Sequence, residues 1–427
     1  MAAPMSGAGT RTTWCHENGY TPTRMLALPP YVTVWVLLVL AWSANFIIRI
    51  GFSAVLPPII AELGLSYTRA GMLAGAFFWA YVAMQIPAGL LGDRFGRRRV
   101  LLVGLVGGAC AAALTGAAGS FAMLVVARVL TGAFQGSLFS NDRAIIVAVT
   151  PPDKIGLGQG VSFSGPGIGL TLGLLMGGVL GEWLSWRTTL WLFALGPMIA
   201  ALCIARWVPA PPAAAPSGRA GARLLSVLAH PGMWLLGIVG SCGIYVQFVL
   251  ATWAPLLFGE TGVEALGRAG AYASLQGVAA VAAPMAGGWI DDRMRRRGLS
   301  HTVVIAVGLA ALALSTAAMA GAIAARSTLG LAAALFAASF FSWSIWAAVY
   351  ALVGEMVRPA SLGTAFGLLN SVSFLGAVVG PPLTGWVRDS TGSFAPGCLL
   401  AALVALVGAV LSLALRPPAP PAPGARR

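Results

Sequence analysis

Residues 89–99 read GLLGDRFGRRR and place one acidic and four basic side chains between two long apolar stretches. The same glycine, aspartate and arginine pattern returns 198 positions later in GGWIDDRMRRR, residues 287–297. A second set repeats at an offset of 207: Pro152, Gly156 and Gly160 return as Pro359, Gly363 and Gly367. Two repeats of the same order in matching loops predict a duplicated unit in parallel topology.

The composition around these loops is that of a membrane protein. Of 427 residues, 58% are hydrophobic and 9% are charged, whereas soluble domains carry about 25% charged residues. This excludes an ordinary soluble enzyme. The net charge of +14 lies in short runs between apolar stretches, so it indicates membrane topology and no nucleic-acid partner.

A membrane-spanning helix needs about 20 apolar residues, and twelve such stretches can be delimited. They are 32–56, 67–91, 98–118, 120–142, 157–181, 187–207, 232–258, 268–290, 300–324, 328–353, 361–387 and 394–415. The predicted fold is all-α and integral to the membrane, with two pseudo-symmetric six-helix bundles. The expected divisions are an N-terminal tail 1–30, a first bundle 31–207, a Pro- and Ala-rich linker 208–231, a second bundle 232–415 and a C-terminal tail 416–427.

Basic residues set the expected orientation. The tails and even-numbered loops hold 19 of them and the other loops hold 5, which leaves Arg49 and Arg128 inside the membrane. The positive-inside rule then places both termini in the cytoplasm. We expect a multi-pass membrane protein, in the inner membrane if the source is bacterial.

The first loop resembles the signature of the major facilitator superfamily, roughly G-x-L-x-D-R-x-G-R-R. The matching positions are Gly89, Leu91, Asp93, Arg94, Gly96, Arg97 and Arg98. The resemblance implies a secondary transporter that works by alternating access. It also implies a conformational latch, in which Asp93 and its basic neighbours, with Asp291 in the second copy, hold the two bundles together through bonds that break during transport.

The first and fourth spans resemble the organic-anion branches of that family, which are the anion:cation symporters and the organophosphate:phosphate antiporters. The resemblance is carried by Arg49 within NFIIRIGFSAVLPPIIAELGLS and by the run from Arg128 to Gly136. It implies that Arg49 binds the acid group of the substrate. Two positions depart from the pattern: Gln135 stands where many proton-coupled symporters have glutamate, and Gln247 stands where the antiporters have a second arginine.

The physical chemistry of Arg49 points the same way. A charge at the bilayer centre costs at least about 2.5–3.5 kcal/mol, so it is usually kept for a wet cavity. A guanidinium group can bind a carboxylate through two parallel hydrogen bonds. Asn45 lies one turn earlier and would share its face. The alternatives are an internal ion pair for Arg49, an interhelical hydrogen bond for Asn45, and a structural role for Arg128 in place of one on the substrate path.

Further residues are candidates for lining the site, chiefly in the second half. They are Gln135, Tyr245, Gln247, Gln276, Trp343, Trp346, Tyr350 and Asn370. The three aromatic residues follow a spacing of i, i+3 and i+7, so they share one helix face. This face could stack on a ring-bearing substrate. Packing or lipid contact is the alternative.

The remaining expectations concern coupling, direction and cofactors. Asp142 is the candidate for proton coupling, against a solvated charge at a helix end. The glycine run of residues 165–181 partly resembles drug antiporters and, with the aromatic face, supports an alternative function as an exporter of amphipathic compounds. The chain lacks GxxxxGK[ST] and HExxH patterns, so we expect no enzyme activity, cofactor or metal. The expected partners are a small organic anion, a carboxylate in particular, and the bilayer, and we expect the protein to be a monomer.

Overall fold

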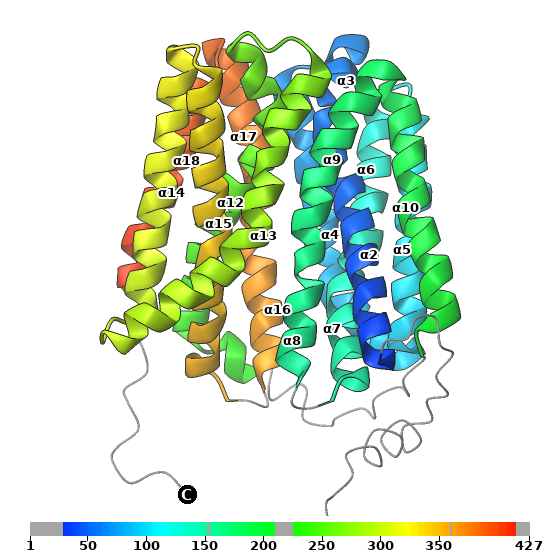
Figure 1. Ribbon diagram of the computed structural model, residues 1–427, viewed down its shortest axis with the longest axis vertical. Coiled ribbons are helices and arrows are strands. Elements are labelled where there is room, and N and C mark those ends of the chain that lie inside the picture. Colours follow the sequence, from blue (N-terminus) through cyan, green and yellow to red (C-terminus); the bar gives the residue numbers. More distant parts are fainter. Residues whose placement is uncertain (1–28, 152–153, 210–224, 359–360, 416–427) are drawn as a thin grey trace, which may run out of the picture.

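The computed structural model describes residues 29–151, 154–209, 225–358 and 361–415. The tails 1–28 and 416–427, most of the expected linker, and two of the repeated prolines, Pro152 and Pro359, lie outside the described residues. The described part is built from helices that run nearly parallel to one another (Figure 1). Helices are expected in a bilayer, because every backbone polar group of a helix can form its hydrogen bond within its own segment.

Six spans come before residue 208. Their helices are α2 (Pro30–Ala54), continued by α3 (Leu56–Leu63); α4 (Tyr67–Phe95); α5 (Arg97–Gly116); α6 (Phe121–Gly136) with α7 (Leu138–Val149); α8 (Ile155–Ser162) with α9 (Ser164–Trp183); and α10 (Trp186–Trp207). We call the end of the molecule where α2 begins the terminal end, and the opposite end the far end (Figure 1).

Six more spans follow residue 230. They are α12 (Pro231–Glu260); α13 (Leu266–Arg296); α14 (His301–Ala324); α15 (Thr328–Met356); α16 (Leu362–Ser373) with α17 (Leu375–Thr391); and α18 (Ala395–Leu413). Among the described residues, eleven spans are long and apolar enough to cross a membrane. The twelfth, α13, is 31 residues long and ends in three arginines, and it packs between α9 and α15. The predicted all-α, two-bundle architecture is confirmed.

The spans differ from the sequence prediction in their interior breaks and in their ends. Three expected single helices each consist of two pieces, with breaks at Ser137, Phe163 and Phe374. The fourth span continues to Val149, seven residues beyond the expected end at Asp142. A hydropathy profile cannot locate such breaks, because apolar residues continue on both sides of them.

Local sequence explains how several helices start at the far end. Four of them begin after a serine whose Oγ accepts a hydrogen bond from the amide three residues later: Ser66, Ser120, Ser185 and Ser327. Each serine satisfies one of the amide groups that a helix start leaves without a partner.

The glycine run of residues 165–181 lets α9 approach two other helices closely. A methyl group added at Gly169 would lie 2.5 Å from Phe46 Cβ on α2, and one added at Gly270 would lie 2.9 Å from Gly178 Cα. The second contact joins the two bundles near the far end. Close packing therefore accounts for glycines on α9 and α13, as small residues do elsewhere in membrane helices.

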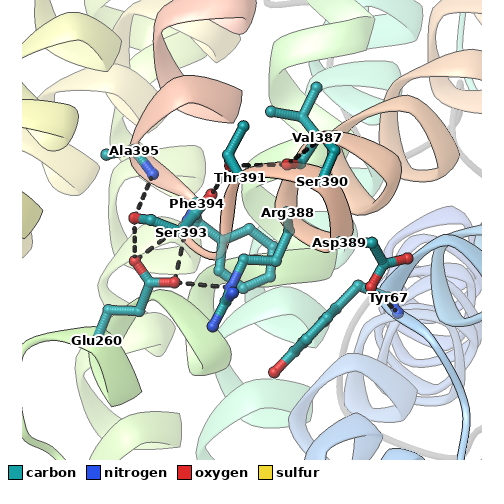
Figure 2. Close-up of polar contacts among 10 residues, drawn as sticks. All are labelled: Tyr67, Glu260, Val387, Arg388, Asp389, Ser390, Thr391, Ser393, Phe394 and Ala395. Atoms are coloured by element: carbon teal, nitrogen blue, oxygen red, sulfur yellow. Dashed lines mark hydrogen bonds and ion pairs between the residues drawn. The ribbon is translucent and has the colours of Figure 1, made fainter.

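The far end is closed by polar contacts between the bundles. Asp389, at the end of α17, accepts hydrogen bonds from the amides of Tyr67 and Thr68 at 2.9 and 2.8 Å, and from Thr68 Oγ1 at 2.6 Å. Those amides belong to the first turn of α4, so a carboxylate of one bundle caps a helix of the other. Arg388 pairs with Glu260 at 2.8 Å and lies over the ring of Tyr67 (Figure 2).

Candidate substrate site

Arg49 lies on α2 in the centre of the first bundle and is 2% exposed. Its Nε donates to Gln135 Oε1 on α6 at 3.1 Å. Gln135 Nε2 in turn donates to the carbonyl oxygen of Asn45 at 3.2 Å, and Asn45 Nδ2 donates to Ala41 O at 2.8 Å. The structure therefore brings together three polar residues that the sequence singled out, and the partner of the buried charge is a neutral carboxamide.

Aromatic rings surround the Arg49 guanidinium group. Its Cζ lies 4.6 Å from the ring centres of both Phe46 and Tyr81, 5.1 Å from Phe77 and 6.0 Å from Phe78. Such cation–π contacts stabilise a desolvated cation without neutralising it. Arg49 Nη2 is buried and has no hydrogen-bond partner among the described residues. A donor that is buried without a partner is costly, so it is available to an anion.

Arg128 on α6 lies close to this cluster. Its side chain is 3% exposed, and its Cζ lies 4.4 Å from the ring centre of Phe52 and 4.6 Å from that of Phe77. Phe77 therefore contacts both guanidinium groups. The Nε of Arg128 lies 3.5 Å from Leu73 O, at the limit of a hydrogen bond. These contacts are consistent with a structural role for Arg128. Its nearness to Arg49 is also consistent with a role on the substrate path.

A small cavity, with room for about one water molecule, lies between the two bundles beside this cluster. Phe46, Ile50 and Leu170 line it from the first bundle, and Gln247, Phe248, Leu250, Ala251, Gln276, Ser339, Ser342 and Trp343 line it from the second. Phe46 lines this cavity and is also one of the four rings around the Arg49 guanidinium group. Ser342 Oγ donates to Gln247 Oε1 at 3.4 Å, and Gln276 Nε2 donates to Ala273 O at 3.2 Å. The cavity wall therefore combines neutral polar groups with aromatic and aliphatic surface.

Sequence reasoning named three of these lining residues and missed others. Gln247, Gln276 and Trp343 were expected, whereas Ser339, Ser342 and Phe248 were not. Ser339 lies four residues before Trp343, so helical spacing could have identified it. Small hydroxyl residues are common inside membrane helices, and their presence alone gives no signal.

The other aromatic candidates of α15 lie closer to the terminal end. Trp346 and Tyr350 contact each other with ring centres 5.6 Å apart, and Tyr350 also lies 6.4 Å from Phe163 of the first bundle. They do not line the described cavity. The expected aromatic face thus divides into one ring at the cavity and two rings in a contact between the bundles.

Two further candidates also lie away from the cavity wall. Asn370 donates to Gln85 Oε1 across the bundles, which makes it part of the contact between α16 and α4. Tyr245 is 5% exposed and packs against α17, where its main chain closely approaches Gly376. Its hydroxyl group lies near that of Thr384 on α17.

Asp142 is 1% exposed, so it is not a solvated charge at a helix end. Its Oδ2 accepts hydrogen bonds from Trp42 Nε1 at 3.0 Å and from Ser162 Oγ at 3.3 Å, and it pairs with Arg143 Nη2 at 2.6 Å. The other oxygen, Oδ1, is buried without a partner among the described residues. The burial follows from the continuation of the helix beyond residue 142.

The loop motif is held within the first bundle. Arg97 pairs with Asp93 one turn earlier and donates to Gly89 O at 3.3 Å, while Gly96 joins α4 to α5 with a φ of +96°. Arg98 donates to Ala205 O of α10. We expected Asp93 to join the two bundles, but the contact it makes here joins α4 to α5 because its partner is only four residues away. Arg94 is exposed and lies over the Phe95 ring.

The second copy of the motif uses different partners. Asp291 is 5% exposed and lies 2.9 Å from His301 Nδ1, whose Nε2 is 3.4 Å from Glu355. Arg295 pairs with the same glutamate at 3.0 Å. The two loops therefore share a sequence pattern and differ in the bonds that they make.

Comparison with known proteins gives the same fold and function class. The chain is 26% identical over 404 residues to a probable sulfoacetate transporter of Cupriavidus necator, covering 88% of this chain and 92% of that one. It is 27% identical over 361 residues to the 3-(3-hydroxy-phenyl)propionate transporter of Escherichia coli, covering 82% and 87%. A bacterial homologue of the human lysosomal transporter Spinster, solved in an inward-facing and occupied conformation, superposes with a TM-score of 0.79 at 19% identity, covering 91% and 97%.

The family model for the Major Facilitator Superfamily matches residues 35–325 and 298–427. These matches run through both six-helix bundles, and the similar curated proteins are named as transporters. The chain is therefore a membrane transporter and a member of the Major Facilitator Superfamily.

Proposed function

We propose that this transporter moves a small organic anion, a carboxylate in particular, and that Arg49 binds its acid group. The observation that carries the proposal is the unpartnered Nη2 of a guanidinium group that is 2% exposed. The side chain that accepts from its Nε, Gln135, is neutral, so the positive charge is available to an anion.

The residues that line the adjoining cavity would contact the remainder of the substrate, and the cavity, which has room for about one water molecule in this structure, would have to widen to admit it. Its walls offer carboxamide and hydroxyl groups together with the rings of Phe46, Phe248 and Trp343. Neutral polar groups suit hydroxyl or carbonyl substituents, and rings suit a planar or aliphatic backbone. The curated relatives support this class of ligand, since they include transporters named for sulfoacetate, hexuronate and galactonate.

Alternating access of the cavity between the two bundles is part of the proposal. So are the cytoplasmic location of both termini, a monomeric state, and proton coupling through Asp142, whose support is a buried carboxylate oxygen without a partner. An internal site between two similar bundles can be exposed on either side by rocking one bundle against the other.

A binding experiment tests the role of Arg49. The full-length protein is screened by thermal shift against organic acids, phosphate esters and hydrophobic cations, because a ligand that binds the native state raises its apparent stability. We expect stabilisation by carboxylates, about a 100-fold loss of affinity in Arg49→Ala, and partial retention in Arg49→Lys. Arg69→Ala, which removes an exposed arginine on the same bundle, is the control.

The same screen separates the two candidate functions. Stabilisation by carboxylates that is equal in the wild type and in Arg49→Ala would overturn the assignment of Arg49. Stabilisation by hydrophobic cations alone would favour the exporter of amphipathic compounds. Uptake of a labelled acid into proteoliposomes then measures transport by the same variants.

A further inference from the structure

Helix α5 begins with three consecutive arginines, Arg97 to Arg99, which is an unfavourable place for them. The N-terminus of a helix carries partial positive charge, and acidic side chains usually offset it. Here the first turn contains no acidic residue, and the capping position, Gly96, has no side chain that could accept from the free amides. The first turn of α5 is thus a concentration of positive charge, and Asp93 on α4 offsets it only at Arg97.

Two of the three arginines have partners in the protein. Arg97 pairs with Asp93, and Arg98 donates to the carbonyl oxygen of Ala205 near the end of α10. Arg99 is exposed and makes no polar contact within the described part of the chain. The loop motif therefore accounts for Arg97 and Arg98 but leaves Arg99 unexplained.

Arg99 stands at the mouth of an apolar groove between α4, α5 and α6. The groove is lined by Met84, Leu91, Phe95, Arg99, Val100, Val103, Ala133, Phe134 and Ser137. Apart from Arg99 and Ser137, every one of these side chains is apolar. Phe95 is 50% exposed and Val103 is 62% exposed. Both α5 and α6 pack mainly against helices of their own bundle, so the groove opens towards the bilayer and away from the second bundle.

The length of the groove suits one lipid chain. Along α4 it extends from Phe95 back to Met84, and these eleven steps along the helix correspond to roughly 16 Å at about 1.5 Å each. Half of a bilayer core about 30 Å thick is nearly the same length. The charged mouth lies at the terminal end, where the head groups of one leaflet are found, and the apolar part runs towards the bilayer centre.

We propose that this groove binds one anionic phospholipid, with the phosphate on Arg99 and the free amides of α5 and an acyl chain between α4, α5 and α6. An anionic head group is required because the mouth carries an unpaired guanidinium group and the positive end of a helix. A lipid without net charge would bring its own cation to a site that is already positive.

The location gives the lipid a structural consequence. Leu91 and Phe95 flank Asp93 on α4, and Val100 follows the arginines on α5. A lipid in the groove would therefore contact both helices that the pair of Asp93 and Arg97 joins. It would stabilise that junction and the first bundle as a whole.

Lipid binding can be measured on the delipidated full-length protein in detergent. Phosphatidylglycerol or phosphatidylcholine is added to the micelles, and bound lipid is counted by native mass spectrometry while the melting temperature is recorded. We expect phosphatidylglycerol to bind and to raise the melting temperature by several degrees, with little effect of phosphatidylcholine. Arg99→Gln should weaken phosphatidylglycerol binding about 10-fold, as expected for loss of a charge-assisted hydrogen bond.

Matched variants make the test specific. Arg297→Gln removes the arginine at the equivalent position of the second copy, which is also exposed and does not line the groove, and it should bind the lipid as the wild type does. Ala133→Trp fills the groove and should weaken binding while leaving Arg99 in place. Glycerol phosphate, which has the phosphate but no chain, should not raise the melting temperature.

The proposal fails if Arg99→Gln and Ala133→Trp both bind phosphatidylglycerol as tightly as the wild type. It also fails if Arg297→Gln loses as much affinity as Arg99→Gln, since binding would then reflect the general positive charge of the loops. Stabilisation by glycerol phosphate alone would assign the mouth to a soluble anion and overturn the lipid site.

Discussion

Arg49 and Gln135 are joined by a hydrogen bond of 3.1 Å from Nε to Oε1, at a depth where neither side chain reaches solvent. The bond orients the guanidinium group and fixes α2 to α6. It leaves the positive charge uncompensated, because a carboxamide is neutral. The same two positions therefore determine both the geometry of the binding group and its charge.

Replacement of Gln135 by glutamate should make anion binding sensitive to pH. The new carboxylate would lie next to Arg49 and compete with the substrate, so we expect carboxylate affinity to fall about 10-fold at neutral pH. Protonation at lower pH should remove the competitor and restore binding. Thermal-shift titrations at several pH values measure this effect, and Gln135→Leu serves as the uncharged control. Equal affinities for Gln135→Glu and wild type across the pH range would contradict a role for Arg49 in anion binding.

Asp142→Asn should separate proton coupling from substrate exchange. The asparagine side chain keeps the shape of the aspartate and an acceptor for Trp42 Nε1, but it cannot bind and release a proton as a carboxylate does. We expect uphill accumulation driven by a pH gradient to be lost, while exchange of labelled for unlabelled substrate continues. Both are measured in proteoliposomes. Accumulation at the wild-type level would exclude Asp142 as the coupling group.

Asp142→Ala should instead weaken the fold. Arg143 is largely buried and would lose its ion-pair partner at 2.6 Å, and removal of one partner from a buried pair typically destabilises by about 3–5 kcal/mol. A fall in melting temperature larger than that of Asp142→Asn is the expected result. A melting temperature of Asp142→Ala equal to that of the wild type would show that the pair contributes little to stability.

Asp389→Asn should favour separation of the bundles at the far end. The neutral side chain can still accept a hydrogen bond from the amides of Tyr67 and Thr68, but it loses the interaction of a negative charge with the start of α4. That interaction is worth about 1 kcal/mol, so the open fraction should rise about five-fold. Spin labels at positions 69 and 391 report the separation. Asp292→Asn, which changes an exposed aspartate at the other end, is the control, and an unchanged distance distribution would count against the role of Asp389.

Glu62 should make a small, pH-dependent contribution to the far end of the first bundle. Hydrogen bonds from Trp186 Nε1 and Arg187 Nη1 hold the pKa of the Glu62 carboxyl below its usual value. Because the pKa is lowered in the folded protein, this contribution is present above the ordinary pKa of glutamate and is lost as the pH falls through the lowered value. The melting temperature of Glu62→Gln should therefore depend less on acid pH than that of the wild type. Parallel pH profiles for the two proteins would refute this.

Sequence reasoning predicted the two bundles because the length and spacing of apolar stretches are written directly in the chain. It also identified Arg49 and its neighbour Asn45, since a charge at mid-membrane depth stands out against apolar neighbours. Gln135 was identified by the resemblance of the fourth span to the organic-anion branches. The four aromatic rings around Arg49 could not be predicted in the same way. Phe77 and Tyr81 are ordinary apolar and aromatic residues of α4, and their approach to α2 depends on how the helices pack.

The burial of Asp142 and the position of Asn370 show a second limit of prediction from the sequence. The fourth span was expected to end at Asp142 but continues for seven more residues. Asp142 was therefore expected to be a surface charge, whereas it forms a buried ion pair. Asn370 was expected to line the site, yet it contacts Gln85 of the other bundle. Helix boundaries and rotation about the helix axis decide such cases, and neither is fixed by hydropathy.

The contact of Asp389 with α4 affects how the far end of the protein can vary in sequence among related chains. On the α4 side, two of the three groups that meet the carboxylate are main-chain amides, which almost every amino acid supplies. Substitutions at positions 67 and 68 therefore leave those two amide donors in place, proline excepted. A single substitution can remove the aspartate or the hydroxyl group of Thr68, but the two main-chain bonds depend on the aspartate alone. These two bonds will therefore leave little trace as correlated substitution, and a search for covarying positions would overlook them.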